Sequence, residues 1–495
     1  MGNVILLIAL PLAMAFFIPM VGRKVRWLPD VLANITTLGL FVLAGQSWGR
    51  EGIYTMGGWP APLGIVLVLD GLSALLLFII NLISFLATLF SVDYLEKLYT
   101  SKLRYYSLFL LMVAGMNGAV LTGDFFNLFV FLEIASIASY ALVGFGCEAE
   151  ELEASFKYLV IGSIASTFIL LGVALLYGRF ATLNMADVAS ALQHHGFDQV
   201  SLFALVLLVV GFCTKAALVP FHAWLPDAHP SAPAPISAML SGVLIKAIGI
   251  YALVRLVYNV FGISPLLASL FTYLGVISMM AGVLLALGQW DFKRLLAYHS
   301  ISQMGYVILG FGLATPLGLL GGLFHLLNHS LFKSLLFFDS GSVEYETGTR
   351  NLEKMGNLVQ KMPVTSGSSL MASLSISGIP PFNGFWSKLV IILAAVQAQR
   401  PGLALWAVAG SILTLASFSK IQRYAFWGQG KDFDAKLWEG WKEVPVLMRV
   451  PLLVLAVLCL GSGLALWHGL KGLFGPAISV LTDGPTAYIA KVLGR

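Results

Sequence analysis

Apolar stretches of about 20 residues recur along the whole chain and alternate with short polar segments. A helix of about 20 residues crosses the ~30 Å hydrocarbon core of a bilayer. Glycine and proline inside these stretches argue little against helix, because neighbouring helices satisfy the backbone groups that a kink frees. The pattern predicts fourteen spanning helices, numbered 1 to 14 in chain order, at residues 3–21, 28–49, 65–91, 103–122, 124–146, 155–179, 200–221, 233–260, 265–288, 296–313, 316–339, 363–398, 403–427 and 447–470.

The composition agrees with this pattern. The 495 residues are 58% hydrophobic and 11% charged, and the mean hydropathy is +0.88. These values are typical of an all-α polytopic membrane protein rather than of a soluble enzyme. The first span lacks a basic n-region and an A-x-A site, so we expect a retained helix there and not a signal peptide.

The three cysteines, Cys147, Cys213 and Cys459, are scattered along the chain and form no C-x-x-C. This spacing argues against an iron–sulfur cluster and against a disulfide framework in this chain. We therefore expect no cofactor here, and any redox chemistry must lie on a partner subunit.

The basic residues outside the spans divide unevenly between the two sides of the predicted membrane. Eighteen fall on one side, Lys24, Arg104, Lys293, Arg294 and Arg350 among them, and seven fall on the other. The positive-inside rule makes the first side cytoplasmic and places both termini outside, in the inner membrane of a prokaryotic-type cell. The net charge of +5 therefore reflects topology, and we see no nucleic-acid patch. The smaller set is Arg50, Arg179, Arg255, Arg400, Lys471, Lys491 and Arg495.

Two of the spans contain proline-rich breaks. Helix 7 reads KAALVPFHAWLP around Pro220, and helix 12 reads SISGIPPFNGFWSKL around Pro380 and Pro381. A lysine lies close to each break, Lys215 in helix 7 and Lys388 in helix 12. Paired interruptions in two halves indicate a transporter built from repeats, with the ion path at the broken helices. Ordinary proline kinks are the alternative, and the lysine beside each break favours the repeat.

The two breaks lie five helices apart, and an odd repeat length reverses the direction of each helix in the second copy. We therefore predict two inverted five-helix repeats. The expected division is 1–102 with helices 1–3, 103–262 with helices 4–8, 263–427 with helices 9–13, and 428–495 with a cytoplasmic surface loop and helix 14.

Five ionisable residues lie inside the predicted spans: Glu133, Lys215, Lys246, Lys333 and Lys388. Each costs about 2.5–3.5 kcal/mol at the centre of a bilayer, so five in one chain indicate a charge path. Lys215 is the natural counter-charge of Glu133, and at ~4 Å with an effective dielectric near 20 their attraction is about 4 kcal/mol. Separating the pair would release or capture a proton. A static pair that locks two helices is the alternative.

Helix 11 places His325, His329 and Lys333 at i, i+4 and i+8, on one helical stripe. Histidine titrates near neutral pH, so this stripe can pass protons with the help of water. Histidines satisfied in the core are the alternative. A haem needs ligands on both faces of the ring, and H-E-x-x-H is absent because Leu, Leu and Asn separate the two histidines.

Lys246 lies in the middle of helix 8, between the two halves, and is expected to relay charge from Lys215 towards helix 11. Lys388 would serve the far end of the path. His222 and His229 flank the first break and are candidates for lining water. His299 is expected at the start of helix 10, where a capping role is an equal alternative. Four aspartates near predicted helix ends are expected at the membrane interface: Asp70, Asp124, Asp227 and Asp339.

Five segments carry a family resemblance: LTGDFFNLFVFLEIASIASYAL, TKAALVPFHAWLPDAHPSAPAPISAMLSGVLIKAIGIYALVR, LLAYHSISQMGYVILG, FHLLNHSLFKSLLFF and SGIPPFNGFWSKL. They resemble the antiporter-like membrane subunits shared by respiratory complex I, membrane-bound hydrogenases and Mrp-type sodium/proton antiporters. The resemblance covers nearly the whole chain. It implies fourteen helices, an inverted pair of five-helix units and a central hydrophilic axis.

The resemblance also assigns roles by position. Glu133 matches the helix 5 glutamate of the family, Lys215 the helix 7 lysine and Lys246 the helix 8 lysine. The stripe of His325, His329 and Lys333 matches the helix 11 stripe. Lys388 matches the ionisable residue of helix 12, which is a glutamate in some members. The chain ends shortly after helix 14, so we expect it outside the branch that carries a long lateral helix.

We therefore expect a proton-translocating, or cation-translocating, subunit of a redox-driven complex of the membrane-bound hydrogenase or NADH dehydrogenase type. Its partners would be other membrane subunits and a peripheral arm with iron–sulfur clusters. The segment PDAHPSAPAPISAML favours this branch. The alternative is a component of a multisubunit cation/proton antiporter without a redox partner. A membrane cytochrome is disfavoured because its ligands are missing.

Overall fold

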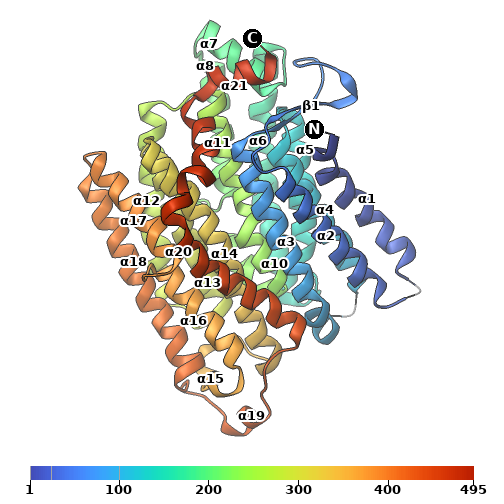
Figure 1. Cartoon of the computed structure of the whole chain (residues 1–495), viewed down its shortest axis with the longest axis vertical. Coiled ribbons are helices and arrows are strands. Elements are labelled where there is room, and N and C mark those ends of the chain that lie inside the picture. Colours follow the sequence, from blue (N-terminus) through green and yellow to red (C-terminus); the bar gives the residue numbers. More distant parts are fainter. Residues whose placement is uncertain (1, 24, 100, 495) are drawn as a thin grey trace.

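Long helices packed side by side make up most of the molecule, as Figure 1 shows. The structure is a computed structural model that describes residues 2–23, 25–99 and 101–494, and for residues 465–468, 470 and 471 it describes the backbone alone. The short helices α7 (Met185–His195) and α21 (Gly484–Leu493) lie at one end of the bundle, called the α7 end below. The short helices α15 (Leu358–Lys361) and α19 (Ala435–Glu439) lie at the opposite end, called the α15 end.

Each of the fourteen predicted spans coincides with a helix or with a broken helix of the structure. In the described part of the chain, ten helical segments are long and apolar enough to cross a membrane by length and composition. Predicted helices 7 and 12, which are broken, and the more polar α13 (Phe292–Gly312) and α14 (Pro316–Thr347) complete the fourteen. The unbroken helices are α1 (Leu6–Val21), α2 (Leu28–Gln46), α3 (Gly71–Leu98), α4 (Lys102–Leu121), α5 (Phe125–Val143), α6 (Ala149–Phe180), α12 (Pro265–Leu287), α13 (Phe292–Gly312), α14 (Pro316–Thr347) and α20 (Val446–Thr482). The predicted fold class, an all-α polytopic membrane protein, is confirmed.

The start of the third predicted span is wrong. Residues 66–69 form strand β2 (Val66–Leu69), which pairs antiparallel with β1 (Gly52–Thr55) at the α7 end. Helix α3 begins only at Gly71, because the Asp70 side chain accepts the Ser73 backbone N–H and so caps the helix. Four consecutive apolar residues fit a buried strand as well as a helix, so hydropathy alone did not separate the two.

Helices 7 and 12 are broken where the prolines predicted. Helix 7 consists of α8 (Gln199–Lys215) and α9 (Leu225–Ser231), and Ala217 between them has a φ of 54°. Helix 12 consists of α16 (Pro363–Ser377) and α17 (Asn383–Gln397), with Gly378 at a φ of 78°. A residue in the left-handed region ends a helix and exposes its last carbonyl groups.

Two other helices change their winding within the bundle. Helix 8 begins as α10 (Ala234–Met239), continues as the π-helical segment η3 (Leu240–Tyr251), passes through α11 (Ala252–Arg255) and ends as the π-helical segment η4 (Leu256–Val260). Helix 13 consists of α18 (Pro401–Ile421) and the π-helical segment η6 (Gln422–Trp427). Segments of π-helix are rare and occur frequently at functional sites.

An internal correspondence supports the inverted repeats. Asp124 caps α5 and forms a β-bridge with Asn184, and Asp291 caps α13 and forms a β-bridge with Asn351. Both members of the second bridge lie 167 residues after their counterparts (124 to 291, 184 to 351). The backbone hydrogen bonds repeat with the same spacing: Phe125 and Met185 donate to Leu183 and Gly123 at 2.9 Å, and Phe292 and Leu352 donate to Arg350 and Trp290 at 2.9 Å.

The two bridges lie at opposite ends of the bundle. Asn184 immediately precedes α7, at one end of the molecule, whereas Asn351 lies seven residues before Leu358, which begins α15 at the other end. Helices 4–8 and helices 9–13 therefore repeat the same connections in opposite orientation. The division of the chain after residues 102, 262 and 427 stays a prediction.

Asp70 lies at a helix end, as predicted, where it caps α3, and Arg255 lies near the end of helix 8. Both residues are buried, and they form an ion pair with Arg255 Nη1 2.8 Å from Asp70 Oδ2 and Nη2 2.9 Å from Oδ1. The pair links the start of α3 to helix 8. The side assignment of Lys24 and Arg495 lies outside the described residues, as does the side chain of Lys471.

We expect Arg255→Met to lower the stability of the protein by about 3–5 kcal/mol, because it leaves Asp70 buried without a counter-charge. The measurement is the thermal unfolding midpoint of the detergent-purified protein. The double variant Arg255→Met with Asp70→Asn recovers much of the loss because it removes both charges. Arg179→Met is the matched control, since Arg179 pairs with Asp198 at the surface and should matter little. An Arg255→Met midpoint equal to that of the control would contradict the structural role of the pair.

Candidate functional site

The first predicted pair forms at the break of helix 7. Lys215 Nζ lies 3.7 Å from Glu133 Oε1, and it donates to Ser136 Oγ at 2.9 Å and to Tyr140 Oη at 3.3 Å. Lys215 is the last residue of α8, and Glu133, Ser136 and Tyr140 all lie on α5. The break thus holds an ammonium group against one polar face of α5, where a carboxylate and two hydroxyls surround it.

Glu133 has a second partner and is not fully enclosed. The Ser166 hydroxyl of α6 donates to Glu133 Oε1, and the Glu133 side chain keeps 27% of its surface exposed on this single chain. Lys215 is only 2% exposed by the same measure. The pair therefore reaches from the buried axis to the lateral surface between α5 and α6.

Lys246 lies inside the π-helical segment η3 and is fully buried. Its Nζ donates to the carbonyl oxygens of Ser241 and Gly242 at 2.7 and 2.5 Å. In a π-helix each N–H reaches back five residues rather than four, which changes which carbonyls are available to a side chain of the same helix. The local winding of helix 8 therefore provides the partners of this lysine.

The helix 11 stripe is buried along its whole length on α14. His325 contacts Ser387 Oγ of α17 at 2.9 Å and Gln303 Oε1 of α13 at 3.1 Å. Lys333 Nζ donates to the Leu296 carbonyl of α13. Neither ring nitrogen of His329 has a hydrogen-bond partner among the described residues. Proton transfer along the stripe would therefore require water between the rings and Lys333.

Lys388 occupies the break of helix 12. It is buried, its Nζ donates to the Ile376 carbonyl at 2.7 Å, and the same atom lies 4.8 Å from the centre of the Tyr306 ring. Ile376 belongs to the last turn of α16, whose carbonyls lack partners within the helix. Ser387, the neighbour of Lys388, contacts His325, so α17 joins the stripe to this end of the path.

The expected placement of His299 at the start of a helix is wrong. Helix α13 begins at Phe292, so His299 lies two turns inside it, fully buried, with Nε2 2.8 Å from Ser417 Oγ of α18. Leu296, one turn before His299 on the same helix, accepts from Lys333, so His299 lies close to the end of the stripe. The Asp-Phe pair at 124–125 recurs at 291–292, and this signal could have placed the helix start correctly.

His229 is the second histidine that the structure places on the axis. It lies on α9, it is fully buried, and neither ring nitrogen has a hydrogen-bond partner among the described residues. The charges of Lys333 and Lys246 act on its ring, which packs 5.0 Å from the ring of Phe337. His222, the other histidine of this break, is only half-buried.

Of the three remaining aspartates, two lie at helix ends and one lies inside a helix. Asp124 caps α5, and Asp227 lies in the first turn of α9, where it pairs with Lys157 at 3.1 Å and with Arg294 at 3.3 Å, so both lie at helix ends as predicted. Asp339 does not. Helix α14 continues to Thr347, so Asp339 lies inside it, fully buried, and accepts from the Ser368 hydroxyl at 2.6 Å.

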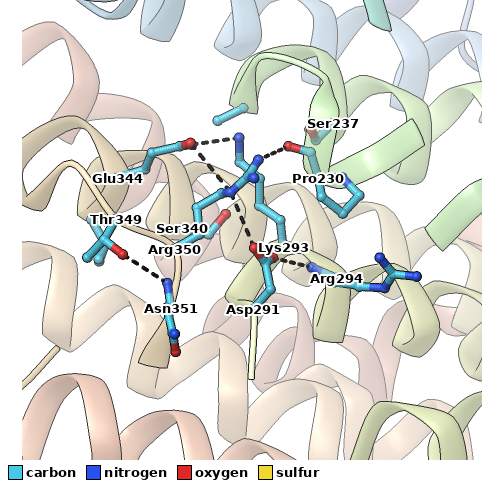
Figure 2. Close-up of polar contacts among 12 residues, drawn as sticks. Pro230, Ser237, Asp291, Lys293, Arg294, Ser340, Glu344, Thr349, Arg350 and Asn351 are labelled. Carbon is cyan, nitrogen blue, oxygen red and sulfur yellow. Dashed lines mark hydrogen bonds and ion pairs between the residues drawn. The ribbon is translucent and has the colours of Figure 1, made fainter. Parts of the chain in front are cut away.

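A cavity of about 910 Å³ opens near the α15 end, between the turn that joins α5 to α6 and the adjoining ends of α9, α13 and α14. Figure 2 shows the charged cluster on its wall. Lys293 Nζ lies 2.6 Å from Glu344 Oε2 and donates to the Ala232 carbonyl at 3.2 Å. Arg350 Nε lies 3.3 Å from Asp291 Oδ2 and 3.8 Å from Glu344 Oε1.

Sequence reasoning missed this cluster because its members resemble ordinary loop charges. Lys293 belongs to the basic residues predicted on the cytoplasmic side, yet its side chain is only 2% exposed. Glu344 lies at the end of α14, beyond the predicted end of helix 11. No group of three or more His, Cys, Asp and Glu side chains in the described part of the chain is arranged to hold a metal ion.

Together the site residues form a chain of buried basic groups that crosses both repeats. Of the four lysines predicted inside the spans, Lys215 alone has a carboxylate within ion-pair distance among the described residues. The other three donate to backbone carbonyls. A carbonyl compensates an ammonium charge only in part, so these lysines can give up a proton at lower cost than a fully paired lysine. Such groups are suited to transient proton occupancy.

Comparisons with known proteins agree with this arrangement. The family described as NADH:quinone oxidoreductase/Mrp antiporter, TM, matches residues 122–414, which include every predicted site residue. The chain is 35% identical over 505 residues to a Na(+)/H(+) antiporter subunit of Alkalihalophilus pseudofirmus, with 100% of both chains covered. It is 37% identical over 429 residues to an NADH-quinone oxidoreductase subunit of Desulforudis audaxviator, with 84% of each covered.

A solved structure extends the similarity to three dimensions. A chain of the membrane-bound sulfane sulfur reductase, an archaeal respiratory membrane complex, has a TM-score of 0.90 and 35% sequence identity, with 99% of both chains covered. The resemblance inferred from the motifs is therefore confirmed. The chain belongs to the NADH:quinone oxidoreductase/Mrp antiporter family and is an antiporter-like, ion-transporting membrane subunit.

Proposed function

We propose that this chain translocates protons as one membrane subunit of a respiratory complex, and that electron transfer on partner subunits of the membrane-bound hydrogenase or NADH dehydrogenase type drives it. The observation that carries the proposal is the line of buried lysines at the two helix breaks, in η3 and on α14. Four lysines in membrane-spanning segments cost too much to be incidental, at about 2.5–3.5 kcal/mol each.

In this proposal the Glu133–Lys215 pair controls one end of the path. When the pair separates, Lys215 loses the partner that stabilises its charge, and a proton moves on towards Lys246. The stripe of His325, His329 and Lys333 then carries it to Lys388. His229 and His299, both fully buried, are further candidates for the path.

The partly exposed carboxylate of Glu133 supports the proposed membrane partners. On a single chain the exposed part of this side chain would face hydrocarbon at the depth of α5, which is costly for an ionised group. A neighbouring membrane subunit that covers this face would remove that cost. We propose a peripheral arm with iron–sulfur clusters as the further partner that supplies the redox energy.

We propose further that the α15 end faces the cytoplasm and that both termini lie outside. The ends of the described chain lie in the same half of the bundle, towards the α7 end (Figure 1). Lys293, Arg294 and Arg350 of the larger predicted set lie near the α15 end, at the adjoining ends of α13 and α14, which supports a cytoplasmic position by the positive-inside rule.

The antiporter alternative has equal support from the comparisons, because one relative similar over its full length is named as a Na(+)/H(+) antiporter subunit. The same axis of lysines serves both functions, since either one needs a proton path through the membrane. The two functions differ in the partner that supplies the energy for transport.

We expect Lys215→Ala and Glu133→Ala to lower the rate of proton translocation by about 100-fold or more. A loss of this size is typical when a positioned proton-transfer group is removed. The measurement is the quenching of a pH-sensitive dye in membrane vesicles that contain the complete complex. The complex should still assemble, because each variant removes one polar side chain and leaves the apolar packing of α5, α6 and α8 in place. Lys157→Ala is the control, since Lys157 is an exposed lysine on α6. Undiminished transport in either site variant would contradict the assigned roles.

We expect the complex purified through this chain to show iron–sulfur or nickel absorbance, because the proposed driver is redox chemistry on its partners. Electron transfer through the purified complex should acidify one side of a reconstituted vesicle. A complex without either absorbance, whose proton movement depends on an imposed sodium gradient, would overturn the redox proposal in favour of the antiporter.

A further inference from the structure

The cavity near the α15 end is lined by the charged cluster of Lys293, Glu344 and Arg350, called the charged floor below. The proton path described above does not use these residues. Its walls come from the start of α6, the end of α9 and the adjoining ends of α13 and α14. Figure 2 shows Lys293 and Glu344 facing one another there, with Arg350 beside them. Lys293 is buried, whereas the Glu344 side chain keeps 23% of its surface exposed. Burying a charge costs free energy unless it is paired and bonded to its surroundings, and Lys293 is bonded in both ways.

The floor is bonded to the segment that carries His229. Arg350 donates to the Pro230 carbonyl, and Lys293 donates to the Ala232 carbonyl at 3.2 Å. The Ser237 hydroxyl donates to the carbonyl of His229 itself at 2.7 Å. Behind this segment the His229 ring is fully buried, within reach of the charges of Lys246 and Lys333. His229 thus lies between the floor of the cavity and the axis of lysines.

The inverted repeat shows that the fold does not require this charged floor. The positions 167 residues before Lys293, Glu344 and Arg350 are Phe126, Tyr177 and Leu183. They occupy the same places on α5, α6 and the following turn, at the α7 end. Asp291 alone keeps its counterpart, Asp124, because both cap a helix. The β-bridge therefore forms equally well without the charges, and the second repeat alone carries them.

We propose that this cavity is the entrance through which protons reach the axis from the cytoplasm, with Glu344 as the group that accepts them and His229 as the group that receives them next. The inference rests on the proposed function. A proton from cavity water binds a Glu344 carboxylate oxygen and replaces Lys293 as its partner, while Lys293 keeps its bond to the Ala232 carbonyl. The proton then passes through water to a free ring nitrogen of His229 and on to the amine of Lys246 or Lys333. Glu344 returns to the carboxylate and pairs with Lys293 again.

The native Cys147 provides a direct test of the entrance. Cys147 is exposed and lines the cavity, whereas Cys213 and Cys459 are buried. We expect a bulky, membrane-impermeant maleimide to label Cys147 in inside-out vesicles and not in right-side-out vesicles, and to block proton translocation by the complete complex. Cys147→Ser should transport normally and resist the reagent. Labelling from the outside, labelling without loss of transport, or no labelling from either side would each overturn the proposal.

Glu344→Gln tests the accepting group. We expect transport to fall about 100-fold, because glutamine keeps the shape of the side chain and cannot take up the proton. Glu344→Asp should recover part of the rate, which a purely structural role of the ion pair would not explain. Glu150→Gln is the matched control, since Glu150 also lines the cavity and is exposed. If Glu344→Gln transports at the full rate while Lys215→Ala is inactive, the proposed entrance is wrong and the proposed function is still supported. If both variants transport at the full rate, the proposed function itself is wrong.

Discussion

The compensation of buried ammonium groups by backbone carbonyls is the constraint on which the rest of the structure depends. A lysine in a membrane interior needs acceptors, and a helix break or an irregular winding frees carbonyls that a regular helix bonds within itself. Lys388 finds its acceptor in the last turn of α16, where the helix break leaves the Ile376 carbonyl free. Lys246 finds two in the π-helical winding of η3. At these two lysines the irregular backbone therefore supplies the acceptors that the buried charge needs.

The inverted repeat explains how one chain can carry a path with two different ends. The same connections are built twice in opposite orientation, and the capping aspartates Asp124 and Asp291 hold them at opposite ends of the bundle. The side chains that fill these equivalent places are free to differ. Charged Lys293 and Glu344 stand at one end and aromatic Phe126 and Tyr177 at the other. The scaffold is symmetric because the backbone contacts are repeated, and its polarity comes from side chains that those contacts do not constrain.

Much of the architecture could be predicted because burial in a membrane requires local sequence patterns that are easy to recognise. The apolar spans, the proline breaks around Pro220 and Pro381, and the i, i+4, i+8 stripe on helix 11 are local patterns. Each follows from bond geometry or from the cost of burying a charge, and none depends on distant residues. The same locality explains the errors. Strand β2 resembles the start of an apolar helix, and the polar ends of α13 and α14 resemble loops, which misplaced His299 and Asp339.

The sequence by itself determined the membrane class, the number of spans, the two breaks and the four lysines inside the spans, because hydropathy and proline chemistry act within a single segment. Only the tertiary structure decided which of these groups meet. The Glu133–Lys215 pair joins residues 82 positions apart (133 to 215), and the Lys293–Glu344 pair lies under a cavity built from turns of several helices. Such contacts depend on helix rotation and packing, which set the direction of each side chain over distances that no local pattern records.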